Sequence, residues 1–170
     1  LCDRRQRQMC IRDRGKTSTK DLLSSVFSQR FKTTATQGNQ NNEIGVPATI
    51  LAADEDTEVL IVELGMRGMH QIEHLCTFVK PSIAVVTNVA PNHLDVHKDM
   101  AEYVQAKKNV FAHQDASGKV VLNYDNDITR AFAADAPGAV EFFSRLARPE
   151  NGVYLEDGVI VSLIHISEPT

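Results

Sequence analysis

Residues 58–89, EVLIVELGMRGMHQIEHLCTFVKPSIAVVTNV, contain two apolar runs separated by a helical pattern. Residues 58–62 (EVLIV) and 83–89 (IAVVTNV) are short and almost wholly apolar, as buried parallel strands are. Between them, residues 69–79 carry apolar side chains at helical spacing and end just before a proline. A strand, a helix and a strand in this order predict a βαβ unit with a right-handed crossover.

The same alternation continues on both sides of this unit. Before it, residues 17–31 predict a helix, and residues 33–47 predict a polar loop. The expected apolar face of that helix consists of Leu22, Leu23, Val26, Phe27 and Phe31. After the unit we expect a helix over 99–113, a strand over 119–123, a helix over 126–136, a strand over 140–143 and a hairpin over 152–161 that turns at Glu156-Asp157-Gly158. The pattern predicts an α/β domain with a mostly parallel sheet flanked by helices.

Composition favours one soluble domain, because the 170 residues are 42% apolar and 24% charged. No apolar run approaches the roughly 20 residues that a membrane-spanning helix needs, so no membrane partner is expected. Outside residues 1–14 the chain has one cysteine, Cys76, which excludes a disulfide framework and favours the cytoplasm. Residues 1–14 hold five arginines, but the rest of the chain is acidic, so no nucleic-acid partner is expected.

The two ends of the chain differ in character from its body. Residues 1–14 (LCDRRQRQMCIRDR) have neither helical nor strand periodicity, and they stop where the first helical pattern starts. They resemble translated sequencing-adapter DNA, and residues 161–170 (VSLIHISEPT) resemble the same kind of adapter. We therefore expect both ends to be foreign and the natural domain to run over residues 15–160.

Polar residues follow the predicted strands at their carboxyl ends, where α/β proteins bind ligands. Gly15-Lys16-Thr17-Ser18 opens a helix whose first N–H groups favour phosphate; the lysine would reach the terminal phosphates and the threonine would bind Mg²⁺. Glu63 follows the first buried strand and offers a carboxylate to Mg²⁺. An ordinary helix start and a solvated glutamate are the structural alternatives.

Two further motifs follow along the chain. Asn92-His93 comes after the second strand, and His93 could meet the same metal. The HxxxH spacing with His97 suggests zinc, but no glutamate follows His93, so zinc is disfavoured. Lys107 falls close to the apolar face of its helix, whereas Lys108 points further out. A sheltered lysine can add CO₂ to become an anionic carbamate ligand, although two solvated lysines are the ordinary interpretation.

Residues 38–45 (GNQNNEIG) contain three asparagines and two glycines. Asparagine tolerates left-handed turns and offers both donors and acceptors, so this loop could bind a polar ligand. A plain structural turn is an equally good interpretation.

Taken in order, these motifs over residues 15–160 resemble the central, P-loop NTPase-like domain of the Mur ligases, the ATP-dependent amide-forming enzymes of peptidoglycan synthesis. In that family a TG(T/S)NGKT(T/S) loop holds ATP, which phosphorylates the carboxylate of a UDP-muramoyl substrate before an amine attacks the acyl phosphate. The resemblance implies ATP and Mg²⁺ as cofactors. It implies catalytic roles for Lys16, His93 and Lys107; nucleotide binding by Gly15, Lys16, Thr17 and Ser18; metal binding by Thr17, Glu63, His93 and Lys107, the last as a carbamate; and substrate binding by Thr36, Asn39, Asn41 and Asn42.

The two halves resemble different branches of that family. TTATQGNQNNEIGVPATIL and VELGMRGMHQIEHL are similar to MurF, which adds D-alanyl-D-alanine, and APNHLDVHKDMAEYVQAKKNVFAHQ and NYDNDITRAF are similar to MurD, which adds D-glutamate. The resemblance implies a UDP-muramoyl-peptide and a D-amino acid or D-alanyl-D-alanine as partners of a monomer in the bacterial cytoplasm. We favour the MurF type, because the nucleotide and asparagine loops lie in that half. A MurD-type ligase, a chimera of the two and a non-catalytic nucleotide-binding remnant stay open.

The chain departs from the family at the nucleotide loop. Arg12 stands where the family has its first loop glycine, and Arg14 stands where it has asparagine. We also expect the chain to lack the domains that flank the central domain in the family. We therefore expect the isolated chain to be inactive.

Overall fold

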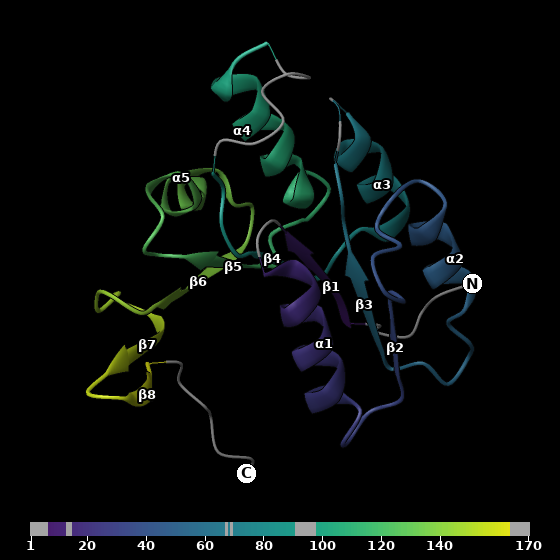
Figure 1. Cartoon of the computed structure of the whole chain (residues 1–170), viewed down its shortest axis with the longest axis horizontal. Helices are drawn as coiled ribbons and strands as arrows, with labels where there is room; N and C mark the ends of the chain where they lie inside the picture. Colours follow the sequence, from purple (N-terminus) through teal and green to yellow (C-terminus); the bar gives the residue numbers. More distant parts are fainter. Residues whose placement is uncertain (1–6, 13–14, 67, 69, 91–97, 164–170) are drawn as a thin grey trace.

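A single sheet forms the centre of the described part of the molecule (Figure 1). The computed structural model describes residues 7–12, 15–66, 68, 70–90 and 98–163. The sheet order is β2-β3-β1-β4-β5-β6-β7-β8, and every neighbouring pair is parallel except the antiparallel pair of β7 and β8. The strands are β1 (Arg7–Arg12), β2 (Thr33–Ala35), β3 (Val59–Glu63), β4 (Ile83–Val86), β5 (Lys119–Asn123), β6 (Ala139–Ser144), β7 (Gly152–Glu156) and β8 (Val159–Ser162). The prediction of an α/β fold with a mostly parallel sheet is confirmed.

Helices cover the two faces of the sheet unequally. They are α1 (Lys16–Phe27), α2 (Gly45–Leu51), α3 (Gln71–Val79), α4 (Met100–Lys108) and α5 (Asp127–Ala131), with short 3-10 turns at Asn109–Phe111 and Phe132–Asp135. The larger core cluster joins α2 to α5 to one face of β3 to β6, whereas α1 packs on the opposite face (Figure 1). After β1 and α1 the chain moves outward to β2 and then back across the sheet. The crossover through α1 runs one way along the sheet, and the crossovers through α2 and α3 run the other way. Right-handed crossovers in opposite directions place their helices on opposite faces.

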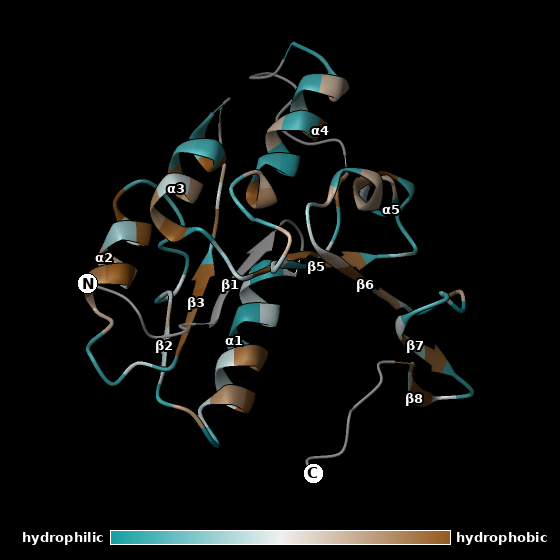
Figure 2. Cartoon of the chain, turned by 180° about the vertical axis from the view of Figure 1, so that it is seen from behind, coloured by the Kyte–Doolittle hydropathy of each residue, from teal (hydrophilic) through white to brown (hydrophobic). Residues whose placement is uncertain are grey.

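The buried strands were correctly located because their apolar runs are long enough to stand out. All five residues of β3 are buried, and the apolar residues of this strand appear in brown in Figure 2. Along β5 the burial alternates, so Val120 and Leu122 lie in the larger core while Val121 faces α1. The hairpin of β7 and β8 turns at Asp157-Gly158, and both residues have positive φ, as a two-residue hairpin turn requires.

A strand occurs where none was expected. Residues 7–12 form β1, which lies between β3 and β4 in the middle of the sheet. Its Met9 is in register with Ile61 on one side and Ile83 on the other. The absence of strand periodicity in residues 1–14 gave no sign of β1, because parallel pairing uses backbone groups that every residue carries. Strand β8 likewise reaches Ser162, inside the expected tail.

Two other expectations are corrected by the tertiary packing. Part of the expected loop over residues 33–47 forms β2, and its end forms the start of α2. The expected helix over 17–31 ends at Phe27 of α1. Leu23 and Phe27 of α1, and Phe31 after it, pack against the sheet as expected, but Leu22 and Val26 are each 66% exposed. They lie on a side of α1 that does not face the sheet, because a helix on a sheet buries only the strip of side chains that points toward it. Next to that strip, Leu23, Val85, Val121 and Phe143 line an apolar hollow of about 670 Å³.

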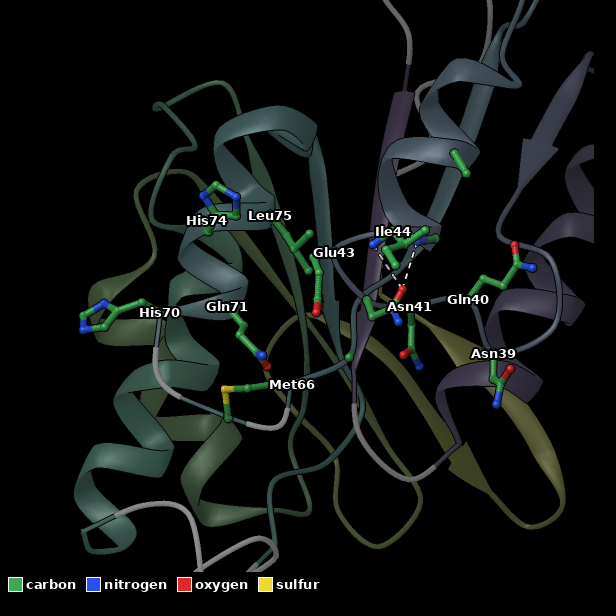
Figure 3. Close-up of a pocket in the computed structure, with 14 residues that line it drawn as sticks. Asn39, Gln40, Asn41, Glu43, Ile44, Met66, His70, Gln71, His74 and Leu75 are labelled. Carbon is green, nitrogen blue, oxygen red and sulfur yellow. Dashed lines mark hydrogen bonds between the residues drawn. The ribbon is translucent and has the colours of Figure 1, made fainter.

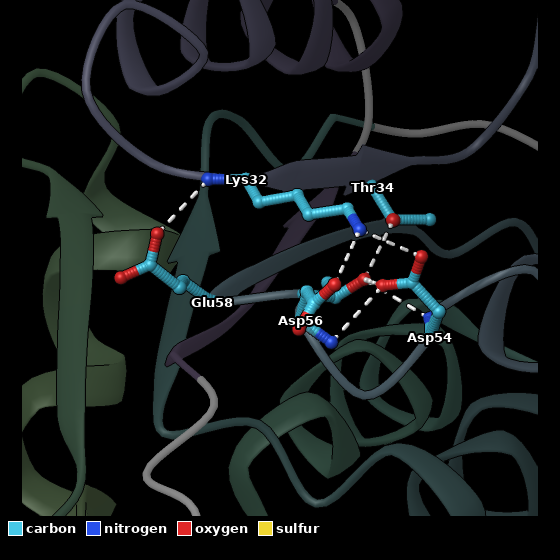
Figure 4. A network of polar contacts seen from close by, with 6 residues as sticks. Lys32, Thr34, Asp54, Asp56 and Glu58 are labelled. Atoms are coloured by element: carbon cyan, nitrogen blue, oxygen red, sulfur yellow. Dashed lines mark hydrogen bonds and ion pairs between the residues drawn. The ribbon is translucent and has the colours of Figure 1, made fainter.

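The start of β2 is tied to the turn before β3 by a polar network (Figure 4). The Lys32 ammonium donates to Asp54 at 2.8 Å and to Asp56 at 3.2 Å, and its backbone N–H donates to Glu58. The two side-chain hydrogen bonds to Asp54 and Asp56 raise the pKa of Lys32. The bond from Lys32 is also the main cause of the lowered pKa of Asp54. The network is exposed to solvent and lies at the amino ends of the strands.

Candidate functional site

The candidate site lies at the carboxyl ends of β1, β2 and β3. The chain leaves β1 toward β2 on one side, whereas β4 lies on its other side, so the direction of the chain along the sheet reverses here. Such a reversal leaves a crevice at the carboxyl ends of the strands, which is where open α/β sheets bind ligands. The start of α1, the loop after β2 and Glu63 at the end of β3 all meet at this edge.

The first turn of α1 is built to accept an anion. Gly15 caps the helix with φ 89°, a left-handed conformation that glycine adopts without strain. Among the described residues no side chain caps this end, and no acidic residue occupies the first turn. The N–H groups of the first turn therefore have no carboxylate of their own helix to bind, and the helix dipole favours a phosphate there. Thr17 and Ser18 lie exposed in this turn.

Glu63 is the centre of the site, although it is only 1% exposed. Its Oε2 accepts a hydrogen bond of 3.0 Å from the Thr17 hydroxyl, and its Oε1 accepts one of 2.8 Å from the Asn41 side-chain amide. Its backbone N–H donates to the Thr36 hydroxyl at 3.0 Å. Within the described residues Glu63 forms no ion pair, so this buried carboxylate is neutralised by no cation of those residues.

These oxygen atoms fit the requirements of Mg²⁺. An octahedral Mg²⁺ with bonds of about 2.0–2.1 Å holds neighbouring ligand oxygens about 2.9 Å apart. The Thr17 and Glu63 oxygens are 3.0 Å apart, so they could occupy two adjacent positions once the hydroxyl proton turns away. The described residues contain no cluster of three or more histidine, cysteine, aspartate or glutamate side chains that could hold a metal. The donor set instead suits an ion that keeps most of its water ligands, as Mg²⁺ does.

The asparagine loop, residues 36–42, is pressed against the end of β3. The Gly65 N–H donates to the Asn41 carbonyl at 2.7 Å, and a Cβ added at Gly65 would lie 2.3 Å from Asn41 Oδ1. Thr36 is 2% exposed, and its described contacts position Glu63. Asn42 accepts from the backbone N–H groups of residues 44 and 45, at the start of α2. These contacts hold the loop against the end of β3 and the start of α2.

A pocket of about 1200 Å³ opens between the asparagine loop and the start of α3 (Figure 3). Figure 3 shows Asn39 and Gln40 on one side and Met66, His70 and Gln71 on the other. The amide groups of the pocket suit a polar ligand, and the volume of the pocket suits a ligand larger than a single amino acid. His70 begins α3 with φ 61° and bonds Glu73 through Nδ1 at 2.7 Å, so its ring is held at the rim.

The segment after β4 is held to the neighbouring strand. The Asn123 side chain donates to the Thr87 carbonyl at 2.9 Å, and the Asn126 side chain donates to the Val89 carbonyl at 3.0 Å. These bonds hold the backbone of Thr87 and Val89 in place. His93 itself, expected as a metal ligand, lies outside the described residues, as does His97.

Lys107 is buried on the apolar side of its helix, so the ordinary interpretation of two solvated lysines is wrong for Lys107. It is 2% exposed, and its Nζ lies 4.7 Å from the centre of the Tyr103 ring. A ring face at this distance stabilises the charged ammonium. Lys108 instead reaches outward to Asp135 at 2.6 Å. The described hydrogen bonds of Glu63 do not include Lys107, so the expected metal-binding role of Lys107 stays a prediction.

Two residues of the site were not expected from the sequence. Gly65 allows the close approach of Asn41, and Lys20 of α1 is 3% exposed with its ammonium directed at the asparagine loop. A glycine two positions after a strand-end glutamate was a signal that could have been used. Lys20 gave none, because a lysine in an amphipathic helix is ordinarily solvated.

No described helix has both the length and the apolar character needed to cross a membrane. The family model of the Mur ligase middle domain matches residues 14–155. A UDP-N-acetylmuramoylalanine–D-glutamate ligase from Acetivibrio thermocellus is 43% identical over 148 residues, which cover 86% of this chain and 30% of that ligase. A UDP-N-acetylmuramoyl-tripeptide–D-alanyl-D-alanine ligase from Synechocystis is 41% identical over 112 residues, covering 66% of this chain and 25% of that ligase.

Solved structures give the same result. The crystal structure of MurF from Acinetobacter baumannii aligns with a TM-score of 0.77 and 26% identity, over 88% of this chain and 32% of that chain. The chain thus spans less than a third of the length of the D-glutamate ligase and about a third of the MurF chain. The matched family model, the parallel sheet and the oxygen cluster at the start of α1 lead to one conclusion: this chain belongs to the Mur ligase family, and its residues 14–155 match the middle domain of that family.

Proposed function

We propose that the chain is the ATP-binding part of a peptidoglycan-precursor ligase that joins an amino compound to a UDP-muramoyl substrate. The single observation that carries this proposal is the cluster of Thr17, Glu63 and Asn41, in which the first turn of α1 meets a buried carboxylate. In a ligase of this kind the substrate carboxylate attacks the γ-phosphorus of ATP and ADP leaves. The amine then attacks the acyl carbon of the acyl phosphate, loses a proton and expels phosphate.

The residues of this chain would prepare both reactants. The first-turn N–H groups and Lys16 would bind the β- and γ-phosphates, and Ser18 would lie beside them. Thr17 and Glu63 would hold Mg²⁺, which neutralises charge on the transferring phosphoryl group. Asn39, Asn41 and Asn42 would bind the polar part of the UDP-muramoyl substrate in the pocket of Figure 3, and Thr36 would position Glu63.

Within the family we propose the D-alanyl-D-alanine-adding type. This proposal rests on the residues that build the site, since residues 33–51 and 62–75 are the segments that resemble MurF. The D-glutamate-adding type is the second candidate. It is favoured by the longer match of the D-glutamate ligase, 148 residues at 43% identity against 112 residues at 41%.

A pair of hybrid enzymes separates the two candidates. Residues 15–160 would replace the matching segment in the Synechocystis ligase and in the A. thermocellus ligase, so that each host supplies its own loop glycines and remaining domains. ATP-dependent phosphate release would be measured with each host's own substrates. Activity of the first hybrid alone would support the D-alanyl-D-alanine type, and activity of the second alone would support the D-glutamate type. If both hybrids fold and neither releases phosphate from ATP, the proposed ligase function is refuted.

Lys107 is proposed as a carbamate that helps to hold a second metal ion. In an active hybrid, Lys107→Ala should reduce phosphate release by about 100-fold or more, as loss of a group that acts on transition-state charge does. Added formate or acetate should restore part of this activity, because a small carboxylate can fill the space of the carbamate. Lys108→Ala is the matched control and should keep most of the activity. A Lys107→Ala variant that short carboxylates do not rescue would contradict the carbamate.

We further propose residues 15–160 as the natural part of the chain, a partial central domain, and residues 1–14 and 161–170 as foreign. Genomic DNA that covers the codons of both ends and of residues 80–95 tests this directly. One uninterrupted gene that encodes the whole chain would refute both the foreign ends and a junction between two ligases.

A further inference from the structure

Lys20 joins the phosphate-binding end of α1 to the asparagine loop. It lies one turn beyond Lys16, and its side chain is 4% exposed. Its ammonium donates to the Thr36 carbonyl at 3.0 Å and to the Gly38 carbonyl at 3.3 Å, and it pairs with Asp21 at 2.7 Å. Three acceptors therefore surround the three N–H groups of this ammonium, which is what a buried lysine requires.

These contacts close a ring of interactions. Thr17, on the same turn of α1, donates to Glu63, and Glu63 accepts from Asn41 in the asparagine loop. The other end of the loop is held by Lys20 through Thr36. The helix that would bind phosphate is thus connected to the loop twice, once through Glu63 and once through Lys20. A movement of the first turn of α1 changes both connections together.

Packing alone does not account for a lysine at this position. Burying an ammonium is costly, and an apolar side chain would fill the same space without that cost. Only a donor, however, can satisfy the carbonyl groups of Thr36 and Gly38, and Gly38 has φ 52°, so the loop turns sharply at the contact. The ammonium thereby selects one conformation of the loop.

We propose that Lys20 is a positioning residue that couples occupancy of the Mg²⁺ site at Thr17 and Glu63 to the order of the asparagine loop. This inference rests on the proposed function, because it uses the proposed metal site. Metal binding at the first turn of α1 fixes Glu63, and Lys20 fixes the opposite end of the loop. With the metal bound, both ends of the loop would be held more firmly, and the loop side of the substrate pocket with them.

Hydrogen exchange of the full chain with and without MgCl₂ tests this coupling. In the wild-type chain, saturating Mg²⁺ should slow exchange of residues 36–45 by about tenfold. In Lys20→Met, which keeps the apolar stem, the loop should exchange about tenfold faster without metal, because two charge-assisted hydrogen bonds are lost. Mg²⁺ should no longer slow exchange of the loop in this variant, although the affinity for Mg²⁺ stays within about threefold of wild type.

Matched variants separate coupling from general destabilisation. Lys32→Met removes another lysine that bonds two acceptors, and it should leave the Mg²⁺ effect on the loop intact. Lys20→Arg should restore part of the effect, since it keeps the charge and the donors. Lys20→Gln, a milder change, replaces Lys20→Met if that variant does not fold. Exchange in β5 and β6 should stay as in wild type in every variant.

The outcomes are distinguishable. If Mg²⁺ binds Lys20→Met and slows its loop as in wild type, the coupling is overturned while the metal site stands. If Mg²⁺ has no effect on the wild-type chain, the proposed metal site is overturned, and the coupling falls with it. If exchange rises equally in the loop, β5 and β6, Lys20 only stabilises the fold and the inference is wrong.

Discussion

The replacement Glu63→Gln tests the proposed metal site most directly. The change keeps the size of the side chain and removes its charge. One amide oxygen can still accept from Asn41, and the new NH₂ group can donate to the Thr17 hydroxyl, which can accept as well as donate. Without metal we therefore expect the variant to stay within about 1 kcal/mol of wild-type stability.

With Mg²⁺ the two proteins should differ clearly. A ligand that binds only the folded state at 100 times its dissociation constant adds about 2.7 kcal/mol of stability. In a domain of this size, each 1 kcal/mol moves the melting temperature by about 2–4 °C. Wild type should therefore gain about 5–10 °C in saturating MgCl₂, whereas Glu63→Gln should gain almost nothing, because the charged ligand is gone.

Differential scanning calorimetry at neutral pH measures both quantities in the same experiment. Glu58→Gln is the matched control, since Glu58 is exposed and bonds the Lys32 backbone away from the site. The control should keep the full Mg²⁺ effect. An equal gain in wild type and in Glu63→Gln would show that the metal binds elsewhere, and the reasoning about Thr17 and Glu63 would be refuted.

Three further predictions concern packing and pH. Gly65→Ala should lower the free energy of unfolding in urea by about 1–3 kcal/mol and weaken Mg²⁺ binding. The new methyl group displaces Asn41, whose Oδ1 lies 2.3 Å from the Cβ position. Unchanged Mg²⁺ binding would contradict this prediction. Leu60→Ala, at 1% exposure, should cost about 2–5 kcal/mol, whereas Val26→Ala, at 66% exposure, should cost less than about 0.5 kcal/mol in the same assay. Because the folded state lowers the pKa of Asp54, this carboxylate should contribute to stability above its ordinary pKa of 3.8, and the contribution should be lost as pH falls through the lower folded value. The difference in melting temperature between wild type and Asp54→Asn should therefore shrink in that pH range and in high salt. A difference that grows toward low pH would refute this prediction.

Local pattern was sufficient for most of the secondary structure. The apolar runs of β3 and β4, the helical spacing of α3 and α4 and the Asp157-Gly158 turn each depend on residues close in sequence. These signals come from the spacing of apolar residues and from the residues that favour turns, and neither depends on distant parts of the chain. The same reasoning placed Glu63 at a strand end and Lys107 on the inner side of its helix.

Tertiary structure alone decided which of these residues meet. Strand β1 has no apolar period of its own, and it exists because β3 and β4 offer backbone partners on both sides. Leu22 and Val26 are exposed because the sheet buries only the side of α1 that faces it. Thr17 and Glu63 are 46 residues apart, and they touch only because the sheet order places β3 beside β1. Lys20 is buried for the same reason, since the asparagine loop folds back over α1. Sequence periodicity reports the surroundings of one segment, whereas the contacts of the site depend on the order in which the strands pair.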